Sequence, residues 1–196
     1  MTTDDLHRHI GTFFDAVGRR EIDIYNEFSL QHEFGVWLRG RVTNSNWKIQ
    51  FERTASFFGV DKKLTKKEID LACFALPMAP ITVMEFKFPR AGQVPIQMFK
   101  FCQDVAFVEE LVLKEKRFPL GCALIVADDA DFYRGSRHQA GTIYSSFRDG
   151  VPIRGTIEKS TGKEEPPVVL QREYRIAWQE VPDMRDLRYA AVTVAQ

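Results

Sequence analysis

Residues 121–127 (GCALIVA) form a continuous apolar run in the middle of the chain. Pro119 precedes the run and Asp128-Asp129 follows it, so the run is short and sharply bounded. A short run with no polar alternation predicts a strand that is buried on both of its faces. Such a strand needs apolar cover on each side, which helices packed on the two faces of a sheet provide.

The remaining apolar patterns predict the elements around this strand. A stripe at helical spacing begins at Leu30 and predicts a helix over residues 29–39. Before it, Asp4 and Asp5 are expected to cap a first helix that ends at Gly18. Further strands are expected over residues 47–53, 68–74, 81–88, 153–158, 168–180 and 188–195, with a helix over 95–116 and either helix or loop over 132–148. We therefore expect one α/β domain over residues 1–196, with helices packed on a mixed sheet.

Composition excludes several classes of protein. The 27 Lys and Arg residues balance the 27 Asp and Glu residues, so the chain lacks the basic field of a protein that coats nucleic acid. No apolar run approaches the roughly 18 residues of a membrane span, and no secretory signal is visible. We expect no membrane association and a cytoplasmic location. Cys73, Cys102 and Cys122 match no zinc or redox motif, which predicts reduced, buried thiols.

Charged residues interrupt two of the predicted strands. Alternation along residues 81–88 places Glu85 and Lys87 on one face, and Asp70 lies inside the apolar strand before it. If these strands are neighbours, Asp70 and Glu85 approach each other, and two close carboxylates repel unless a cation or a proton lies between them. Carboxylate oxygens suit Mg²⁺ or Mn²⁺, and a nearby lysine can stabilise a phosphate or orient a water. The set predicts metal-assisted hydrolysis of a phosphodiester.

The spacing from Asp70 to Glu85-Phe86-Lys87 resembles the D…(D/E)-x-K signature of the PD-(D/E)XK nuclease superfamily. The resemblance covers about residues 29–127 and implies a restriction-endonuclease-like core of helix, three strands, helix and strand, here with a β-hairpin extension over about 128–196. It also implies that Asp70, Glu85 and the backbone carbonyl of Phe86 hold Mg²⁺ or Mn²⁺. Lys87 would position the attacking water or steady the phosphate, and DNA is the commoner substrate in the family.

The resemblance further implies auxiliary residues. Glu33 fits the acid that many members carry on the first core helix, as a metal ligand or to orient a metal-bound water. Gln97 begins Gln-Met-Phe-Lys-Phe, which is similar to the family's Q-x-x-x-Y pattern with Phe101 where Tyr is expected. Gln103 is a competing candidate for the same role.

The charged residues also have plainer interpretations. Glu85 and Lys87 could form a strand-end ion pair, and Asp70 could pair with Lys66 or Lys67. A lysine-rich segment is a candidate for phosphate contact or a solvated face, and it comprises Lys62, Lys63, Lys66 and Lys67.

Two functions are therefore compared. The first is a metal-dependent nuclease that acts on DNA; the alternative is a catalytically inactive module of the same fold that binds nucleic acid or a protein partner. Neutral net charge favours the module. The intact set of Asp70, Glu85 and Lys87 favours the nuclease, because a disused site has no physical reason to keep buried like charges together. Many nucleases of this family dimerise to cut both strands, so a homodimer is a further open expectation.

Overall fold

The computed structural model describes residues 1–196 except Thr43, Arg90, Ala91, Gln93, residues 136–141, Thr161 and Glu164. The described helices are α1 (Thr3–Gly18), α2 (Glu27–Arg39), α3 (Val94–Glu109) and α4 (Ile143–Arg148), with short helical turns η1 (Ala55–Phe58), η2 (Glu110–Lys114, a π-helix that continues α3) and η3 (Ala130–Phe132). The described strands are β1 (Trp47–Thr54), β2 (Glu68–Ala75), β3 (Ala79–Lys87), β4 (Leu120–Ala127), β5 (Ile153–Ile157), β6 (Val168–Tyr174), β7 (Gln179–Glu180) and β8 (Arg188–Ala195).

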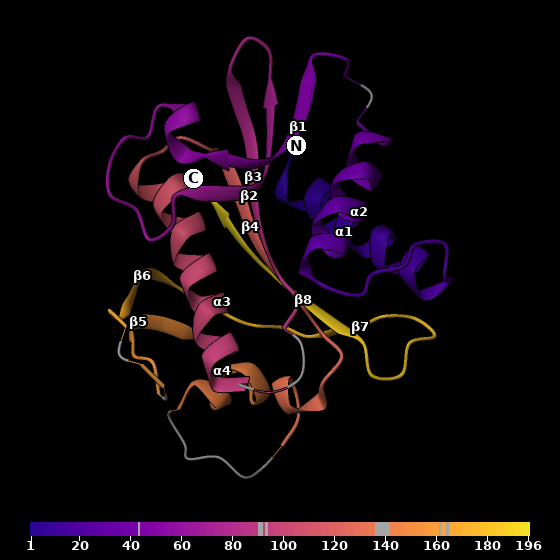
Figure 1. The fold of residues 1–196 in the computed structure, drawn as a ribbon, viewed down its shortest axis with the longest axis vertical. Coiled ribbons are helices and arrows are strands. Elements are labelled where there is room, and N and C mark those ends of the chain that lie inside the picture. The colour runs from indigo at the N-terminus through magenta and orange to yellow at the C-terminus, as the bar shows by residue number, and fades with distance from the viewer. Residues whose placement is uncertain (43, 90–91, 93, 136–141, 161, 164) are drawn as a thin grey trace.

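Six of the strands form one mixed sheet in the order β1-β2-β3-β4-β8-β7, as Figure 1 shows. Only the β3–β4 pair is parallel among the pairs of this sheet that the structure describes; the others are antiparallel. Strands β5 and β6 form a separate antiparallel pair. All eight residues of β4 are buried, which confirms the strand predicted from the apolar run. The expected mixed sheet flanked by helices is therefore present.

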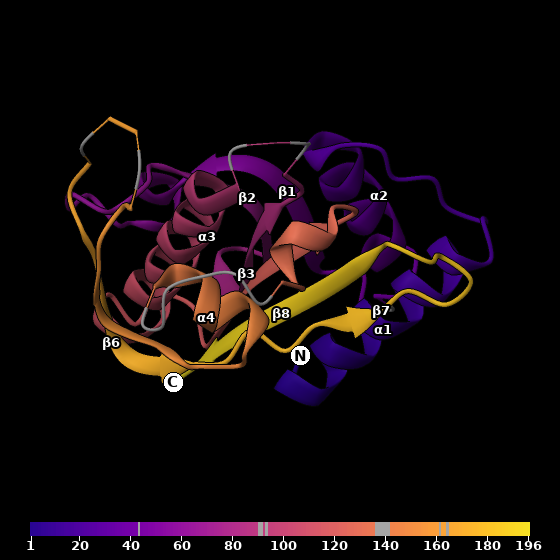
Figure 2. The ribbon, with the colours of Figure 1, turned by 90° about the horizontal axis from the view of Figure 1, so that it is seen from below.

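Helices cover both faces of the sheet (Figure 2). Helices α1 and α2 pack on one face through a core that includes Phe13, Phe34 and Phe86. Helix α3, α4 and the β5–β6 pair cover the other face, where Val83 and Phe99 belong to a second core. Because the two faces are both dry, any charged side chain in the middle of the sheet must find a partner inside the protein.

Helix α3 lies very close to the sheet at Gly121 of β4. A Cβ at this position would lie 2.4 Å from a methyl carbon of Val108 and 2.9 Å from one of Val112. Glycine therefore sets the distance between α3 and β4, and with it the distance from α3 to the neighbouring strand β3. This close approach brings Asp104 of α3 near Lys87 at the end of β3.

The structure corrects some of the expected bounds. Helix α2 begins at Glu27 rather than at Ser29, because Asn26 and Ser29 form a capping box at its start. The single strand expected over 168–180 is instead β6 and β7, which lie in different sheets. The segment 132–148, left open between helix and loop, contains the end of η3 and α4, while residues 136–141 of it lie outside the described residues.

The cysteines and the helices bear on two further properties of the chain. Cys73, Cys102 and Cys122 are free thiols and are all buried, as expected. Within the residues that the structure describes, no helix combines the length and the apolar character needed to cross a membrane.

Candidate functional site

The candidate site lies where β2 and β3 stop pairing through their backbones. The antiparallel register includes Leu71 opposite Met84, which places Asp70 opposite Glu85 at the next position. At this position the side-chain carboxylates accept the hydrogen bonds of the backbone N–H groups. The Asp70 N–H donates to Oε1 of Glu85 at 3.1 Å, and the Phe86 N–H donates to Oδ2 of Asp70 at 2.8 Å. The expected approach of Asp70 and Glu85 is therefore observed, and each carboxylate has one oxygen fixed by a backbone N–H.

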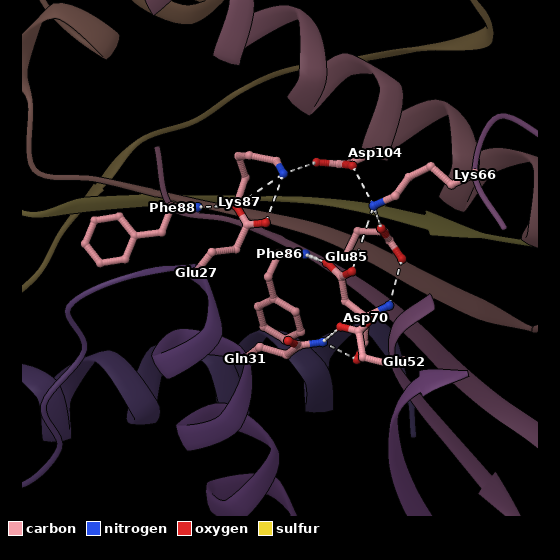
Figure 3. A network of polar contacts seen from close by, with 10 residues as sticks. All are labelled: Glu27, Gln31, Glu52, Lys66, Asp70, Glu85, Phe86, Lys87, Phe88 and Asp104. Atoms are coloured by element: carbon pink, nitrogen blue, oxygen red, sulfur yellow. Dashed lines mark hydrogen bonds and ion pairs between the residues drawn. The ribbon is translucent and has the colours of Figure 1, made fainter. Parts of the chain in front are cut away.

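The second oxygen of each carboxylate faces one ammonium group (Figure 3). The Nζ atom of Lys66 lies 3.9 Å from Oδ1 of Asp70 and makes a close ion pair with Oε2 of Glu85. Asp104 of α3 adds a third carboxylate, with its Oδ1 3.0 Å from the same Nζ. Glu85 and Asp104 are almost fully buried, whereas the Lys66 side chain is 30% exposed. Three carboxylates thus converge on one position for a cation at the edge of the core.

Lys87 lies two residues beyond Glu85 on the same face of β3. Its Nζ is 3.5 Å from Oδ2 of Asp104 and 3.2 Å from the carboxylate of Glu27, in the first turn of α2. The other contact of Glu27 is with the Phe88 N–H, which donates to its Oε2 at 3.2 Å. Lys87 is therefore held from both faces of the sheet, by α2 and by α3 (Figure 3).

Helix α2 also contacts the backbone of Asp70. The side-chain amide of Gln31 donates to the backbone carbonyl of Asp70 at 2.5 Å and to Glu52 of β1 at 2.8 Å. Glu52 adopts a left-handed backbone conformation, with φ of 52°, at the position of β1 that faces Asp70. Residues that are not glycine rarely adopt this conformation, so the local backbone of β1 is strained beside the site.

Burial shapes the electrostatics of these groups. It raises the pKa of Asp70 to about 6, and it raises the pKa values of Glu85 and Asp104 above their usual range. Burial lowers the pKa of Lys66, but the negative charges of Asp104, Glu85 and Asp70 more than reverse this effect, so the net pKa is raised. Asp104 and Glu27 likewise outweigh burial and raise the pKa of Lys87. The two lysines stay protonated and face four carboxyl groups, so acidic groups outnumber ammonium groups in the cluster.

The oxygen ligands of the cluster suit a hard divalent cation, but in this structure an ammonium group lies among them. The free oxygens of Asp70 and Glu85 are the kind of ligand that Mg²⁺ and Mn²⁺ take. As arranged, the described part of the chain contains no group of three or more His, Cys, Asp and Glu side chains that could hold a metal ion. The ammonium of Lys66 lies at the position where the free oxygens converge. A metal ion at this position would therefore have to replace the lysine.

Two residues named from the sequence, Glu33 and Gln103, form contacts outside the cluster. Glu33 is not brought to the cluster; its carboxylate is 3.1 Å from Nδ1 of His32 on the exposed side of α2. The physical reason is helix geometry, because six residues after Glu27 the side chain points about 120° away from it. Gln103 donates to Glu165 at 3.2 Å, and Gln97 is half-buried in the first turns of α3.

The four lysines of the basic segment do not act together. Lys62 is exposed and pairs with Glu115 at 3.1 Å, and Lys63 and Lys67 are exposed. Of these four lysines, Lys66 alone turns inward to the carboxylates. The pairing of Asp70 with Lys66 agrees with the plainer interpretation, but Lys66 also contacts Glu85, so the pair is part of the cluster.

Sequence reasoning missed Asp104 and Glu27. Asp104 is a lone acid in the apolar sequence FCQDVAFV, and a buried acid in an apolar helix is rare unless it is paired or functional. This lone acid was the sequence feature that could have identified Asp104. For Glu27 the signal was the capping pair Asn26 and Ser29, which places Glu27 inside the first turn of the helix.

Comparison with known proteins does not add to this geometry. The chain matches no protein-family model, no curated protein and no solved structure. Function must therefore be argued from the site itself.

Proposed function

We propose that this protein is a metal-dependent nuclease that hydrolyses phosphodiester bonds, with DNA as its substrate. The observation that carries the proposal is the pair of anchored carboxylates. Asp70 and Glu85 each have one oxygen fixed by a backbone N–H and the other turned to a shared cation position. Lys87 stands beside them on the same face of β3.

The two carboxylates and Lys87 have distinct roles in this proposal. Asp70 and Glu85 would hold Mg²⁺ or Mn²⁺, with the backbone carbonyl of Phe86 as a further ligand. A divalent ion bound there supplies an activated water and neutralises charge on the phosphate. Lys87 is fixed by Glu27 and Asp104, so its ammonium can orient the attacking water or stabilise the negative charge that develops on the phosphate.

The order of elements supports the proposed relationship to the PD-(D/E)XK nucleases. Helix α2 is followed by antiparallel β1, β2 and β3, then by α3 and by β4, which is parallel to β3. This is the order of helix, three strands, helix and strand that the resemblance implies. The charged set lies on β2 and β3, the two strands that the signature predicts.

A second function is favoured by one specific observation. The Lys66 ammonium already neutralises the carboxylates, so the cluster could be a purely structural ion-pair network in an inactive module that binds nucleic acid or a protein partner. Such networks are compatible with stability when each charge is paired. The two functions differ in whether the cluster binds a divalent cation and whether the protein cleaves DNA.

A cleavage assay separates the two functions. Plasmid, linear duplex and single-stranded DNA are incubated with the wild type in Mg²⁺ or Mn²⁺, with EDTA as the metal-free control. Asp70→Asn and Lys87→Ala test the cluster, and Asp61→Asn, at an exposed aspartate, is the matched control. The proposal predicts cleavage by the wild type and by Asp61→Asn only, and none in EDTA. If all four proteins are inactive and the wild type binds no metal ion, the inactive module is the better account.

A further inference from the structure

We propose that Lys66 is a built-in competitor for the metal ion: its ammonium fills the cation position between Asp70, Glu85 and Asp104 and leaves when a divalent cation enters. This inference rests on the proposed metal site. It concerns how that site is regulated rather than whether the site exists.

The ammonium of Lys66 lies at the position that a metal ion would take. Lys66 Nζ contacts the free oxygens of Asp70 and Glu85, the same oxygens that would bind a metal ion, while their other oxygens accept backbone N–H groups. The ammonium and a divalent cation therefore need the same ligands. Two cations a few ångströms apart in a buried site repel strongly, so both cannot occupy the position together.

The Lys66 side chain is able to move while its backbone stays in place. The connection that carries it is fixed on either side, since the Thr65 N–H donates to Glu110 at 2.7 Å and the Ala55 N–H donates to the Lys67 carbonyl at 2.9 Å. The side chain itself is 30% exposed. It also borders a surface pocket of about 260 Å³, which Asp61 and the other three lysines of the segment line as well, so the side chain has open space beside it.

The two lysines of the cluster are held in different ways. Lys87 lies on β3 with its side chain only 12% exposed and is held by Glu27 and Asp104, neither of which lies on the strands that bear the proposed metal ligands. Lys66 has contacts with the proposed ligands themselves and lies outside the regular strands. The structure therefore assigns different tasks to them: Lys87 stays as part of the site, and Lys66 is exchanged for the metal ion.

Binding of Mn²⁺, measured by electron paramagnetic resonance, tests the exchange. The variant is Lys66→Met, which keeps an apolar stem of similar length, and the matched control is Lys67→Met at the exposed neighbouring residue. Removal of the competing charge should lower the Kd for Mn²⁺ at least about tenfold in Lys66→Met and leave it unchanged in Lys67→Met. Asp70→Asn should abolish binding in either background.

The outcomes separate the inference from the proposed function. If the wild type binds Mn²⁺ through Asp70 but Lys66→Met binds no more tightly, the competition is overturned and the metal site stands. If neither the wild type nor Lys66→Met binds Mn²⁺, both are overturned.

A second measurement uses only the wild type and does not depend on whether Lys66→Met folds. Amine acetylation followed by peptide mass spectrometry compares Lys66 with Lys67 in the same molecule. Without metal, Lys66 should react more slowly than Lys67, because its ammonium is held among carboxylates. Saturating Mn²⁺ should raise the acetylation of Lys66 severalfold and leave Lys67 unchanged. Mn²⁺ binding with no change at Lys66 would overturn the exchange.

Discussion

The Nζ atom of Lys87 lies 3.2 Å from the carboxylate of Glu27, which ties the end of β3 to the first turn of α2. The contact joins the central strand of the site to the helix on the opposite face of the sheet from α3. Since Asp104 of α3 holds the same ammonium from the other side, the position of Lys87 depends on both helices.

Glu27 is therefore expected to act as a positioning residue for Lys87. Glu27→Gln should lower the rate of DNA cleavage about 10- to 100-fold, because the ammonium loses a charged partner. The Kd for Mn²⁺ should change less than the cleavage rate, since Glu27 acts on Asp70 through its charge whereas it is in direct contact with Lys87. Glu33→Gln is the matched control, an acid on the same helix that lies outside the cluster. Equal rates in Glu27→Gln and Glu33→Gln would contradict this role.

Asp104 is expected to be the residue on which the metal-free cluster depends most for stability. It is buried and pairs with both Lys66 and Lys87, so Asp104→Asn leaves two cations with fewer counter-charges. The free energy of unfolding should fall by about 3–5 kcal/mol. Urea denaturation measures this loss, with the exposed Asp61→Asn expected within about 0.5 kcal/mol of the wild type. A loss in Asp104→Asn no larger than in the control would mean that the ion pairs are not formed.

Stability should depend on pH through Asp70. Burial raises its pKa to about 6 in the folded protein, above the value of about 3.9 that an unfolded chain has. The folded state therefore binds this proton more tightly, and the resulting stabilisation is complete below about pH 4 and declines as the pH rises to about 6. Relative to Asp70→Asn, the wild type in EDTA should lose up to about 3 kcal/mol between these pH values. Urea denaturation at each pH measures the difference, and a relative stability that stays level or rises with pH would contradict the assigned pKa.

The β5–β6 pair is expected to depend on one buried acid of α3. Glu109 accepts hydrogen bonds from the backbone N–H groups of Gln171 and Arg172, at 2.7 and 2.9 Å, and from the Tyr174 hydroxyl at 2.7 Å. Glu109→Gln should weaken all three and cost about 1–3 kcal/mol. Hydrogen exchange at the amides of Gln171 and Arg172 should become faster. Glu173→Gln, at an exposed residue of β6, is the control and should leave these amides protected.

Much of the fold was predictable because the apolar patterns are strong. The eight buried residues of β4 follow from the run over 121–127, and β8 matches its expected bounds. The approach of Asp70 and Glu85 was also predictable, since adjacent strands place them opposite each other. The break between β6 and β7 was not predictable. It arises because the two strands join different sheets, and the local apolar pattern does not show which sheet a strand joins.

The composition of the site was predictable only along the strands. Asp104 reaches the cluster through tertiary packing from α3, and its spacing from Asp70 and Glu85 carries no signal of that meeting. For Lys66 the sequence suggested a pair with Asp70 but not the joint contact with Glu85 and Asp104. Glu33 was named because it flanks the apolar stripe of Leu30 and Trp37, where the family resemblance implies an acid. Glu27 lay outside the helix expected from Ser29 onward, whereas it is in the first turn of α2.

Asp70 and Glu85 are proposed to bind a divalent cation where the Lys66 ammonium now lies. Anomalous scattering from crystals soaked in Mn²⁺ tests it directly. We expect a manganese peak within bonding distance of the free oxygens of Asp70 and Glu85, with the Lys66 side chain turned away from it and Lys87 still paired with Glu27. Crystals saturated with Mn²⁺ that show no peak at these carboxylates, with Lys66 still in contact with Glu85, would contradict it.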